Sequence, residues 1–230
     1  MKKIVILSAG PGLPDIVKKY GHSSEWIPEH LNDFNLNYTV KKVYDNDLCT
    51  LDDGDAWIIT GSKYSVYDNY DWIKELVSFT SDLIKNNKPV LGICFGHQVI
   101  AKAIGGEVLK NPLGWELGSY KVSLTDDGRS NNLFAGINDN DIVYESHQDI
   151  VGNLPTSAKI LANTVKSIQS FCYKNSYGVQ FHPEFSYNVT RMLMDLRINK
   201  GVEVDSDHLE KSTNSHKVLH NFIKIIQGDF

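Results

Sequence analysis

The sequence predicts an α/β fold in which an open, mostly parallel sheet is covered by helices on both faces. Short apolar runs typical of buried strands recur through the first half of the chain, and segments with helical spacing separate them. This alternation builds parallel sheets, because each crossover helix returns the chain to the same end of the sheet. Beyond Gly106 the sequence changes to β-rich segments separated by turn residues, which predicts β-hairpins added to the same sheet system.

Four strands and two helices are predicted in the first half. The strands are the runs at Ile4–Leu7, Tyr38–Val43, Ala56–Thr60 and Val90–Ile93. Between the last two runs, one helix face is formed by Trp72, Ile73, Leu76, Val77, Leu83 and Ile84, and this helix is expected to end at Asn86, before Pro89. A shorter helix is predicted at Trp26–Phe34, where Pro28 is compatible with a helix only in its first turn.

Five strands are predicted after Gly106, and two helices close the chain. The strands are Gly118–Leu124, Ile142–Glu145, Lys159–Ala162, Ser167–Tyr173 and Tyr177–Phe181. The C-terminal helices begin at about residue 188, and the first of them covers Val189–Ile198. The second carries an apolar stripe of Val218, Leu219, Phe222, Ile223 and Ile226, which serves either the core or an interface, and we expect the core. No linker or internal repeat divides the chain, so residues 1–230 are expected to form a single domain.

Length, composition and charge exclude several functional classes. With 230 residues, 41% of them hydrophobic and 22% charged, the chain can bury a large core and does not have the composition of a disordered protein. The net charge is −5, and no basic run could follow a nucleic-acid backbone. No stretch reaches the roughly 18 apolar residues of a membrane span, and the run at Ile4–Leu7 is too short for a secretion signal. We therefore expect no nucleic-acid or membrane partner.

The three cysteines, Cys49, Cys94 and Cys172, are far apart in the sequence and odd in number. This pattern fits neither a disulfide framework nor a zinc knuckle, and the simplest interpretation is three reduced thiols in the cytoplasm. No spacing of His, Cys and Asp residues matches a metal site, so neither a catalytic metal nor another cofactor is expected. The sequence leaves the oligomeric state open.

Cys94 stands in a turn that is typical of a catalytic nucleophile. The strand Val90–Ile93 runs into a Gly-x-Cys-x-Gly pattern at residues 92–96, and a helix is predicted just beyond it at Val99–Ile104. A strand that turns sharply into a helix exposes its nucleophile above the sheet, and the flanking glycines leave room for the turn. The N-terminus of the helix favours the thiolate form. A cysteine alone is more often a buried core residue, but this turn favours a nucleophile.

A cysteine nucleophile needs a base that is near in space rather than in sequence. His182 is the candidate, because it follows a predicted strand and Glu184, two residues on, lies on the same side of the chain. Glu184 could therefore orient His182. His97 is a weaker candidate, because helix geometry carries its side chain away from the open face of the nucleophile. Of the other histidines, His147 ends a strand and could line the pocket, whereas His22, His30, His208, His216 and His220 are expected to be solvated.

Attack by the thiolate creates an oxyanion, which needs two N–H donors facing it. The amide of Phe95, directly after the nucleophile, is one candidate. The second is expected from Gly61 and Ser62, because the strand before them ends at the edge of a parallel sheet where open α/β proteins bind ligands. Taken alone, this segment would be an ordinary turn.

These motifs resemble those of the class I, or triad, glutamine amidotransferase family. The resemblance rests on Gly-Ile-Cys-Phe-Gly-His-Gln at residues 92–98 and His-Pro-Glu at residues 182–184, with Ile-Thr-Gly-Ser upstream at residues 59–62. It covers the chain to about residue 185. It implies a flavodoxin-like fold and hydrolysis of the γ-amide of glutamine through a γ-glutamyl thioester. The roles that it implies are Cys94 as nucleophile, His182 as acid and base, Glu184 as orienting partner, and Phe95, Gly61 and Ser62 as the oxyanion hole.

The resemblance also implies which residues hold the substrate. Gln98 resembles the position that holds the amino-acid head, and Ser146 and His147 resemble a pair that lines the same pocket. Two departures separate this chain from relatives of the GMP synthase type. Gly-Ser-Lys at residues 61–63 replaces Gly-Gly-Pro, and Gln148 replaces the glycine of Ser-His-Gly-Asp, which could reshape the pocket. Residues 61–68 and the segment 114–118, which contains Trp115, are more similar to stand-alone members, including γ-glutamyl peptidases.

Three functions remain open at this point. The first is a glutamine amidotransferase-like hydrolase that passes ammonia to a separate synthase, because no synthetase domain follows Phe230. The second is a stand-alone peptidase that cleaves small γ-glutamyl peptides. The third is a catalytically silent binding or regulatory protein, against which the intact set of Cys94, His182 and Glu184 counts.

Overall fold

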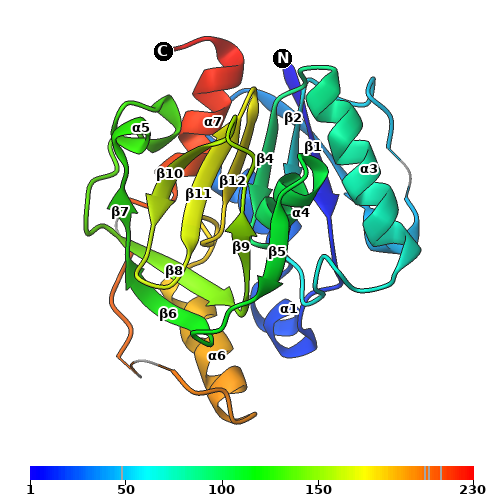
Figure 1. Ribbon diagram of the computed structural model, residues 1–230. Helices are drawn as coiled ribbons and strands as arrows, with labels where there is room; N and C mark the ends of the chain where they lie inside the picture. Colours follow the sequence, from blue (N-terminus) through cyan, green and yellow to red (C-terminus); the bar gives the residue numbers. More distant parts are fainter. Residues whose placement is uncertain (48, 205, 207, 213) are drawn as a thin grey trace.

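The centre of the structure is a mostly parallel sheet (Figure 1). A computed structural model describes residues 1–47, 49–204, 206, 208–212 and 214–230, and within these its main sheet has eight strands in the order β2-β1-β3-β4-β12-β11-β10-β7. They are β1 (Lys2–Ser8), β2 (Leu36–Lys42), β3 (Ala56–Ile59), β4 (Val90–Ile93), β7 (Ser123–Leu124), β10 (Lys159–Asn163), β11 (Ile168–Tyr173) and β12 (Ser176–Val179). Strands β2, β1, β3, β4 and β12 pair in parallel, and the other three are antiparallel. The predicted fold class is confirmed.

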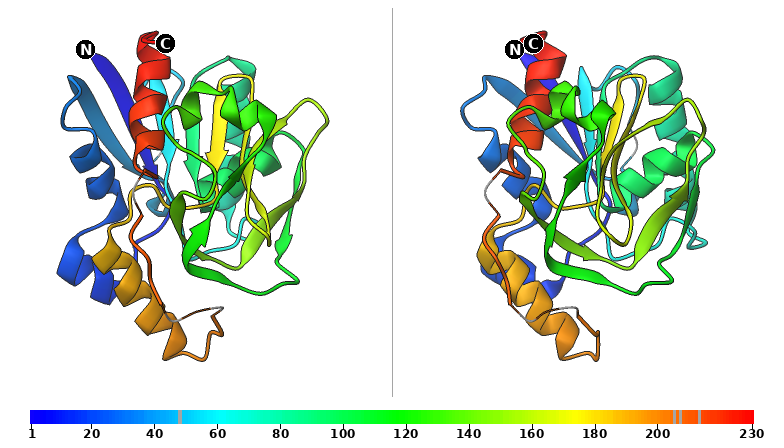
Figure 2. Two further views of the ribbon diagram at one scale, coloured as in Figure 1. Left: turned by 90° about the vertical axis from the view of Figure 1, so that its left-hand side faces the viewer. Right: turned by 60° about the vertical axis from the view of Figure 1, so that its left-hand side comes forward.

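Helices cover both faces of this sheet, as the side chains of β1 show. Ile4 and Ile6 belong to the core on one face, together with residues of α2 (Ser23–His30) and α7 (Lys217–Gln227). Val5 and Leu7 belong to the core on the other face, together with α3 (Asp71–Lys85) and α4 (Phe95–Ala103). Successive strand residues point to opposite faces, so one continuous apolar run serves both cores. Figure 2 shows α7 on the side of the sheet opposite to α3 and α4.

The expectation that all the added hairpins join the main sheet is wrong. Strand β5 (Glu107–Lys110) pairs with β9 (Asp149–Asn153), and β6 (Glu116–Lys121) pairs with β8 (Ile142–His147), in two separate two-stranded sheets. The predicted strand Gly118–Leu124 is accordingly divided at the buried Val122, after which β7 joins the main sheet. A strand shows the same alternation of side chains whether it pairs in the main sheet or in a separate hairpin. The sequence pattern therefore does not reveal which sheet the strand joins.

The segment before β2 also differs from the prediction. A first helix, α1 (Pro14–Tyr20), was not predicted; it begins with Pro14, and Gly21, whose φ is 81°, caps its C-terminus. Helix α2 begins at Ser23, earlier than expected, because His22 and Glu25 form a reciprocal cap at its N-terminus. Pro28 therefore lies in the last turn and not in the first. Histidine is not among the preferred N-cap residues, so the sequence did not indicate that α2 begins at Ser23.

The remaining elements are short, apart from one C-terminal helix. They are the single-turn helices η1 (Val43–Asp45), α5 (Asp126–Arg129) and η2 (Asn132–Phe134), and α6 (Tyr187–Ile198). Helix α6 matches the predicted one closely and is capped by Ser186. In α7, Val218, Leu219 and Phe222 are fully buried in the main core, so the apolar stripe serves the core, as predicted.

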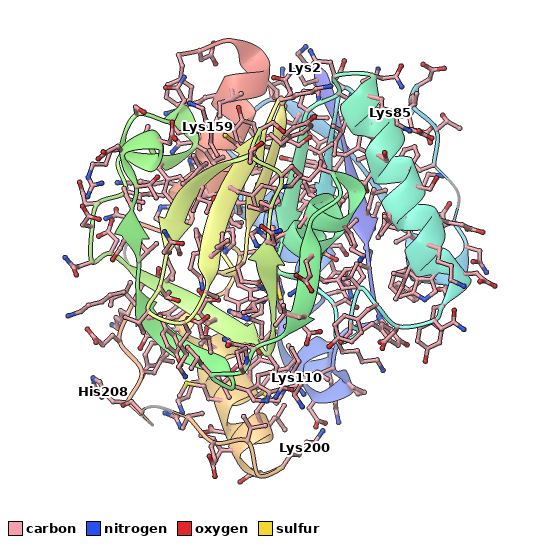
Figure 3. The ribbon with its side chains drawn as sticks, in the orientation of Figure 1. Lys2, Lys85, Lys110, Lys159, Lys200 and His208 are labelled. Atoms are coloured by element: carbon pink, nitrogen blue, oxygen red, sulfur yellow. The ribbon has the colours of Figure 1, made fainter. Side chains whose placement is uncertain are left out.

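Lysine side chains lie at both ends of the molecule. Figure 3 shows Lys2, Lys85 and Lys159 around one end of the molecule, and Lys110 and Lys200 around the other. None of the described helices is both long enough and apolar enough to cross a lipid bilayer.

Candidate active site

The carboxyl ends of neighbouring parallel strands bring the predicted site residues together. Gly61 follows β3, Cys94 follows β4 and His182 follows β12 by three residues. A Cβ atom placed on Gly61 would lie 2.8 Å from His182 Cε1 and 3.6 Å from Cys94 Cβ. These three positions, which are far apart in the sequence, are therefore immediate neighbours at the edge where such sheets bind ligands.

Cys94 has the strained backbone of a nucleophile elbow. Its φ of 51° and ψ of −102° are rare for a residue with a side chain. The flanking glycines make this turn possible by close packing of backbone on backbone. A Cβ on Gly92 would lie 2.3 Å from the carbonyl of Gly96, and a Cβ on Gly96 would lie 2.3 Å from the carbonyl oxygen of Ile59.

Gly96→Ala is expected to destabilise the fold by about 3 kcal/mol or more, because the backbone of β3 cannot yield to the new methyl group. Gly114→Ala is the matched control, since its φ is +82° but nothing lies within 4 Å of an added Cβ; its cost is about 1–2 kcal/mol of backbone strain. Denaturant unfolding of both variants measures the difference. A Gly96→Ala protein as stable as Gly114→Ala would contradict the close packing of the elbow.

The imidazole of His182 is held between a carboxylate and an aromatic ring. Its Nδ1 lies 2.8 Å from Glu184 Oε1, and both side chains are buried. The ring of Phe185 stacks on it, with centroids 3.8 Å apart and planes at 10°. His30 Nε2 lies 3.2 Å from the carbonyl oxygen of Glu184, which fixes the backbone of the motif. Phe185 was not among the predicted site residues, although it directly follows the His-Pro-Glu sequence.

The surroundings of His182 favour the imidazolium. Burial alone is the strongest influence and lowers the pKa of His182, but the charges of Glu184 and Cys94, and hydrogen bonds to both, raise it. The balance raises the pKa of His182 from 6.5 to about 10. His182 is therefore protonated at neutral pH, and a cationic ring next to the sulfur of Cys94 suits nucleophilic attack by sulfur.

The two backbone amides predicted to form the oxyanion hole belong to Phe95 and Ser62. Phe95 is the first residue of α4, and the first N–H groups of a helix have no acceptor within it. In the described chain, the amide of Ser62 has no backbone acceptor either. The hydroxyl of Ser62 donates to the carbonyl oxygen of Ala9 over 2.7 Å and so anchors this turn to the end of β1.

A polar cavity of about 180 Å³ opens beside Cys94. All the predicted pocket residues line it, namely Gln98, Trp115, Ser146, His147 and Gln148, together with Ser62, Phe95 and Cys94. The side-chain amide of Gln98 donates to the carbonyl oxygen of Asp149 over 2.9 Å. The carboxylate of Asp149 accepts hydrogen bonds from the hydroxyls of Ser65 and Tyr67, which ties the loop after β3 to this wall.

Two buried carboxyl groups support His147 behind the polar cavity. Its Nε2 lies 3.0 Å from Glu145 Oε2 and 3.5 Å from Glu116 Oε2, while Nδ1 lies 3.1 Å from the carbonyl oxygen of Asp149. Burial, the main cause, lowers the pKa of His147 to about 4. Burial and the charge of Glu116 raise the pKa of Glu145 well above its ordinary value. His147 is therefore neutral at pH 7, the surroundings of Glu145 favour its protonated form, and His147 is a wall of the cavity rather than a second charged base.

Arg197, near the C-terminus of α6, is a site residue that sequence reasoning missed. It lines the polar cavity and also a second, largely apolar cavity of about 110 Å³ on the side of His182. Its guanidinium lies 5.0 Å from the ring centre of Trp115. Nothing in the local sequence distinguishes Arg197 from an ordinary helix-end arginine, because only the packing of α6 brings it to the site.

The other histidines lie away from the reacting groups or have structural roles. His97 is fully buried, 4.8 Å from the ring centre of Phe171, and burial lowers its pKa to about 3. The expectation of solvated side chains is wrong for His30, His216 and His220, which pack together where α2 meets α7. It is also wrong for His22, whose two ring nitrogens contact Ser24 Oγ and the carbonyl oxygen of Gly10. In the part of the chain that the structure describes, no group of three His, Cys, Asp or Glu side chains is arranged to hold a metal ion.

Comparisons with known proteins agree with this geometry. Residues 15–198 match the family model described as glutamine amidotransferase class-I. A Schizosaccharomyces pombe protein described as glutamine amidotransferase-like is 33% identical over 218 residues, with 87% of this chain and 86% of the relative covered. Gamma-glutamyl peptidase 4 of Arabidopsis thaliana is 27% identical over 241 residues, with 97% and 96% covered. A subunit of the glutamine-hydrolysing GMP synthase of Sulfurisphaera tokodaii is 33% identical over 163 residues, with 70% and 78% covered.

Solved structures share the fold. The crystal structure of a glutamine amidotransferase from Thermotoga maritima has a TM-score of 0.71 at 19% identity, covering 99% of this chain and 94% of its own. A structure from Thermoplasma acidophilum, described as a GMP synthase subunit, has a TM-score of 0.70 at 24% identity, covering 100% and 96%.

Proposed function

The chain belongs to the class I glutamine amidotransferase family, and on this premise we propose that it hydrolyses γ-glutamyl amide bonds with Cys94 as nucleophile, His182 as acid and base, and Glu184 as the residue that orients and charges His182. One observation carries this proposal. A cysteine at a strained elbow adjoins a buried histidine and carboxylate pair, at a point lined by two cavities.

The proposed reaction has two steps, in which His182 first gives a proton and then takes one. The Cys94 thiolate attacks the γ-carbonyl carbon, and the amides of Phe95 and Ser62 hold the oxyanion. The C–N bond breaks, the leaving amine takes a proton from His182, and a γ-glutamyl thioester remains. Water then gives a proton to His182 and attacks the thioester, which releases glutamate and restores the thiolate. The sum is an amide and water converted to glutamate and an amine.

The polar cavity is the proposed site of the glutamyl group. Its wall offers the side-chain amides of Gln98 and Gln148, the hydroxyl of Ser146 and the neutral imidazole of His147. These groups suit the ammonium and carboxylate of an amino acid, because each can accept or donate hydrogen bonds. Trp115 closes the same cavity.

Two substrate classes fit this chemistry. Ammonia release from glutamine would serve a separate synthase, as the similarity to a GMP synthase subunit suggests. Cleavage of small γ-glutamyl peptides is the alternative, and it is favoured by the apolar cavity beside His182 and by similarity to gamma-glutamyl peptidase 4 along almost the whole chain. All three cysteines are unpaired, which supports the cytoplasm as the compartment.

A substrate panel tests the proposal. Release of ammonia from L-glutamine and of free amino acid from γ-glutamyl dipeptides is measured for the wild type beside Cys94→Ala. Cleavage of the dipeptides, with poor turnover of glutamine, identifies a self-sufficient γ-glutamyl hydrolase. Cleavage of glutamine that rises when a synthase is added identifies an ammonia donor. No cleavage that depends on Cys94, with or without such a partner, supports a silent binding protein and contradicts the proposal.

A further inference from the structure

The apolar cavity lies where the leaving amine must depart. His182, which protonates that amine, lines this cavity, and so do Gly61 and Ser62 of the proposed oxyanion hole. The polar cavity adjoins it, because Ser62, Ser146 and Arg197 line both, and it includes Cys94 itself. A γ-glutamyl compound whose glutamyl part fills the polar cavity would therefore direct its amine substituent into the apolar one.

The size and lining of this cavity do not match ammonia. One water molecule, which is about as large as ammonia, needs roughly 10–15 Å³ of such space, whereas the cavity measures about 110 Å³. Its apolar walls come from α1, α2 and α6 and the segments next to them, and consist of Leu13, Ile16, Val17, Trp26, Phe185 and Leu193. Apolar walls favour an apolar substituent, at about 25 cal/mol per Å² of surface removed from water.

Where the two cavities meet stands a cation that has no carboxylate partner among the described residues. Arg197 is partly buried, its Nε has no hydrogen-bond acceptor, and none of the described carboxylates forms an ion pair with it. Among the described residues, Glu184 is the one carboxylate that lines the apolar cavity, and its Oε1 is engaged by His182. The exposed Lys63 lines both cavities as well. Partial burial costs an unpaired cation part of its hydration, and a substrate carboxylate would compensate for that loss.

We propose that the apolar cavity is a leaving-group subsite, and that the preferred substrates are γ-glutamyl amino acids in which an apolar side chain enters this cavity and the free carboxylate binds Arg197. This inference rests on the proposed γ-glutamyl hydrolase function and names its substrate class. Binding of the C-terminal residue then places the scissile amide against Cys94, so that contacts remote from the reacting bond increase kcat/KM.

A comparison of substrates tests the cavity. We expect kcat/KM for γ-glutamyl-leucine and γ-glutamyl-phenylalanine to exceed that for γ-glutamyl-glycine by about 10- to 100-fold, since one apolar group in a pocket contributes discrimination of this order. Leu13→Asp should remove much of this preference, because a carboxylate in the wall disfavours an apolar side chain. Leu13 is the N-cap of α1 and makes no capping hydrogen bond, and aspartate is a favoured N-cap, so the variant should fold. Leu13→Met is the conservative control.

A second comparison tests the carboxylate site. The wild type should cleave γ-glutamyl-phenylalanine about 10- to 100-fold better than its C-terminal amide, as the loss of a charged hydrogen bond implies. Arg197→Met should abolish this difference, and Arg191→Met, on the same helix, should keep it. An equal loss for the acid, the amide and glutamine would instead show that Arg197 binds the glutamyl group, and would overturn its assigned role.

The outcomes separate this inference from the proposed function. Cleavage dependent on Cys94 with equal kcat/KM for the glycine, leucine and phenylalanine dipeptides overturns the leaving-group subsite and leaves γ-glutamyl hydrolysis intact. No cleavage of any compound, including glutamine, overturns both.

Discussion

Cys94→Ala is expected to lower kcat by a factor on the order of 10⁴ or more, without a change in fold. The thiolate supplies the only bond to the γ-glutamyl group in the proposed reaction, and the loss of a triad nucleophile has effects of this size in other hydrolases. The side chain is buried at the edge of the core, so alanine costs little packing. Rates of amino-acid release from a γ-glutamyl dipeptide measure the loss, and circular dichroism checks the fold.

Cys172→Ala is the matched control for this experiment. Cys172 is a partly buried thiol on β11, and it lines neither cavity. Burial, the main cause, raises its pKa, which disfavours its thiolate. The control should retain full activity. A folded Cys94→Ala protein that still turns over substrate at the wild-type rate would refute nucleophilic catalysis by Cys94, whatever the control shows.

The parts of the site that the sequence predicts are those encoded by local turns. The elbow at Cys94 could be predicted because such a turn requires glycines two residues before and two residues after the nucleophile. The contact between His182 and Glu184 could be predicted because alternate residues of an extended segment lie on the same side. The parallel sheet follows from the apolar runs, and it brings the two motifs to one edge.

The residues that could not be predicted are those placed by packing between distant elements. Phe185 reaches His182 only because the chain turns into α6 directly after the motif. Arg197 enters the site from the far end of that helix, and the walls of the apolar cavity come in part from α1, which has the ordinary sequence of a surface helix. Likewise, the side-chain alternation of β6 and β8 is compatible with the main sheet and with a separate sheet. Only the structure shows that these two strands pair with each other, apart from the main sheet.

His182→Ala is expected to lower kcat by about 10² to 10⁴-fold, the contribution of a positioned acid and base, and to lower it more than Glu184→Gln does. A glutamine at position 184 can still accept a hydrogen bond from Nδ1 and so orient the ring, but it carries no charge. Steady-state kinetics of both variants on one γ-glutamyl dipeptide decides the order. Equal losses would argue against the division of roles between His182 and Glu184.

The pH dependence should distinguish loss of charge from loss of orientation. In the wild type the pKa of His182 is about 10, so kcat/KM should hold through neutral pH and fall only as the pH rises through that value. The same shift stabilises the fold below pH 6.5, and this contribution is lost as the pH approaches 10. In Glu184→Gln the strongest influence that raises the pKa of His182 is gone, and only Cys94 then opposes the effect of burial. The pH at which kcat/KM falls should therefore move from about 10 toward neutral. Glu75→Gln, on the surface of α3, should leave this pH unchanged. If kcat/KM of Glu184→Gln fell at the same alkaline pH as that of the wild type, the charge of Glu184 would not be what keeps His182 protonated.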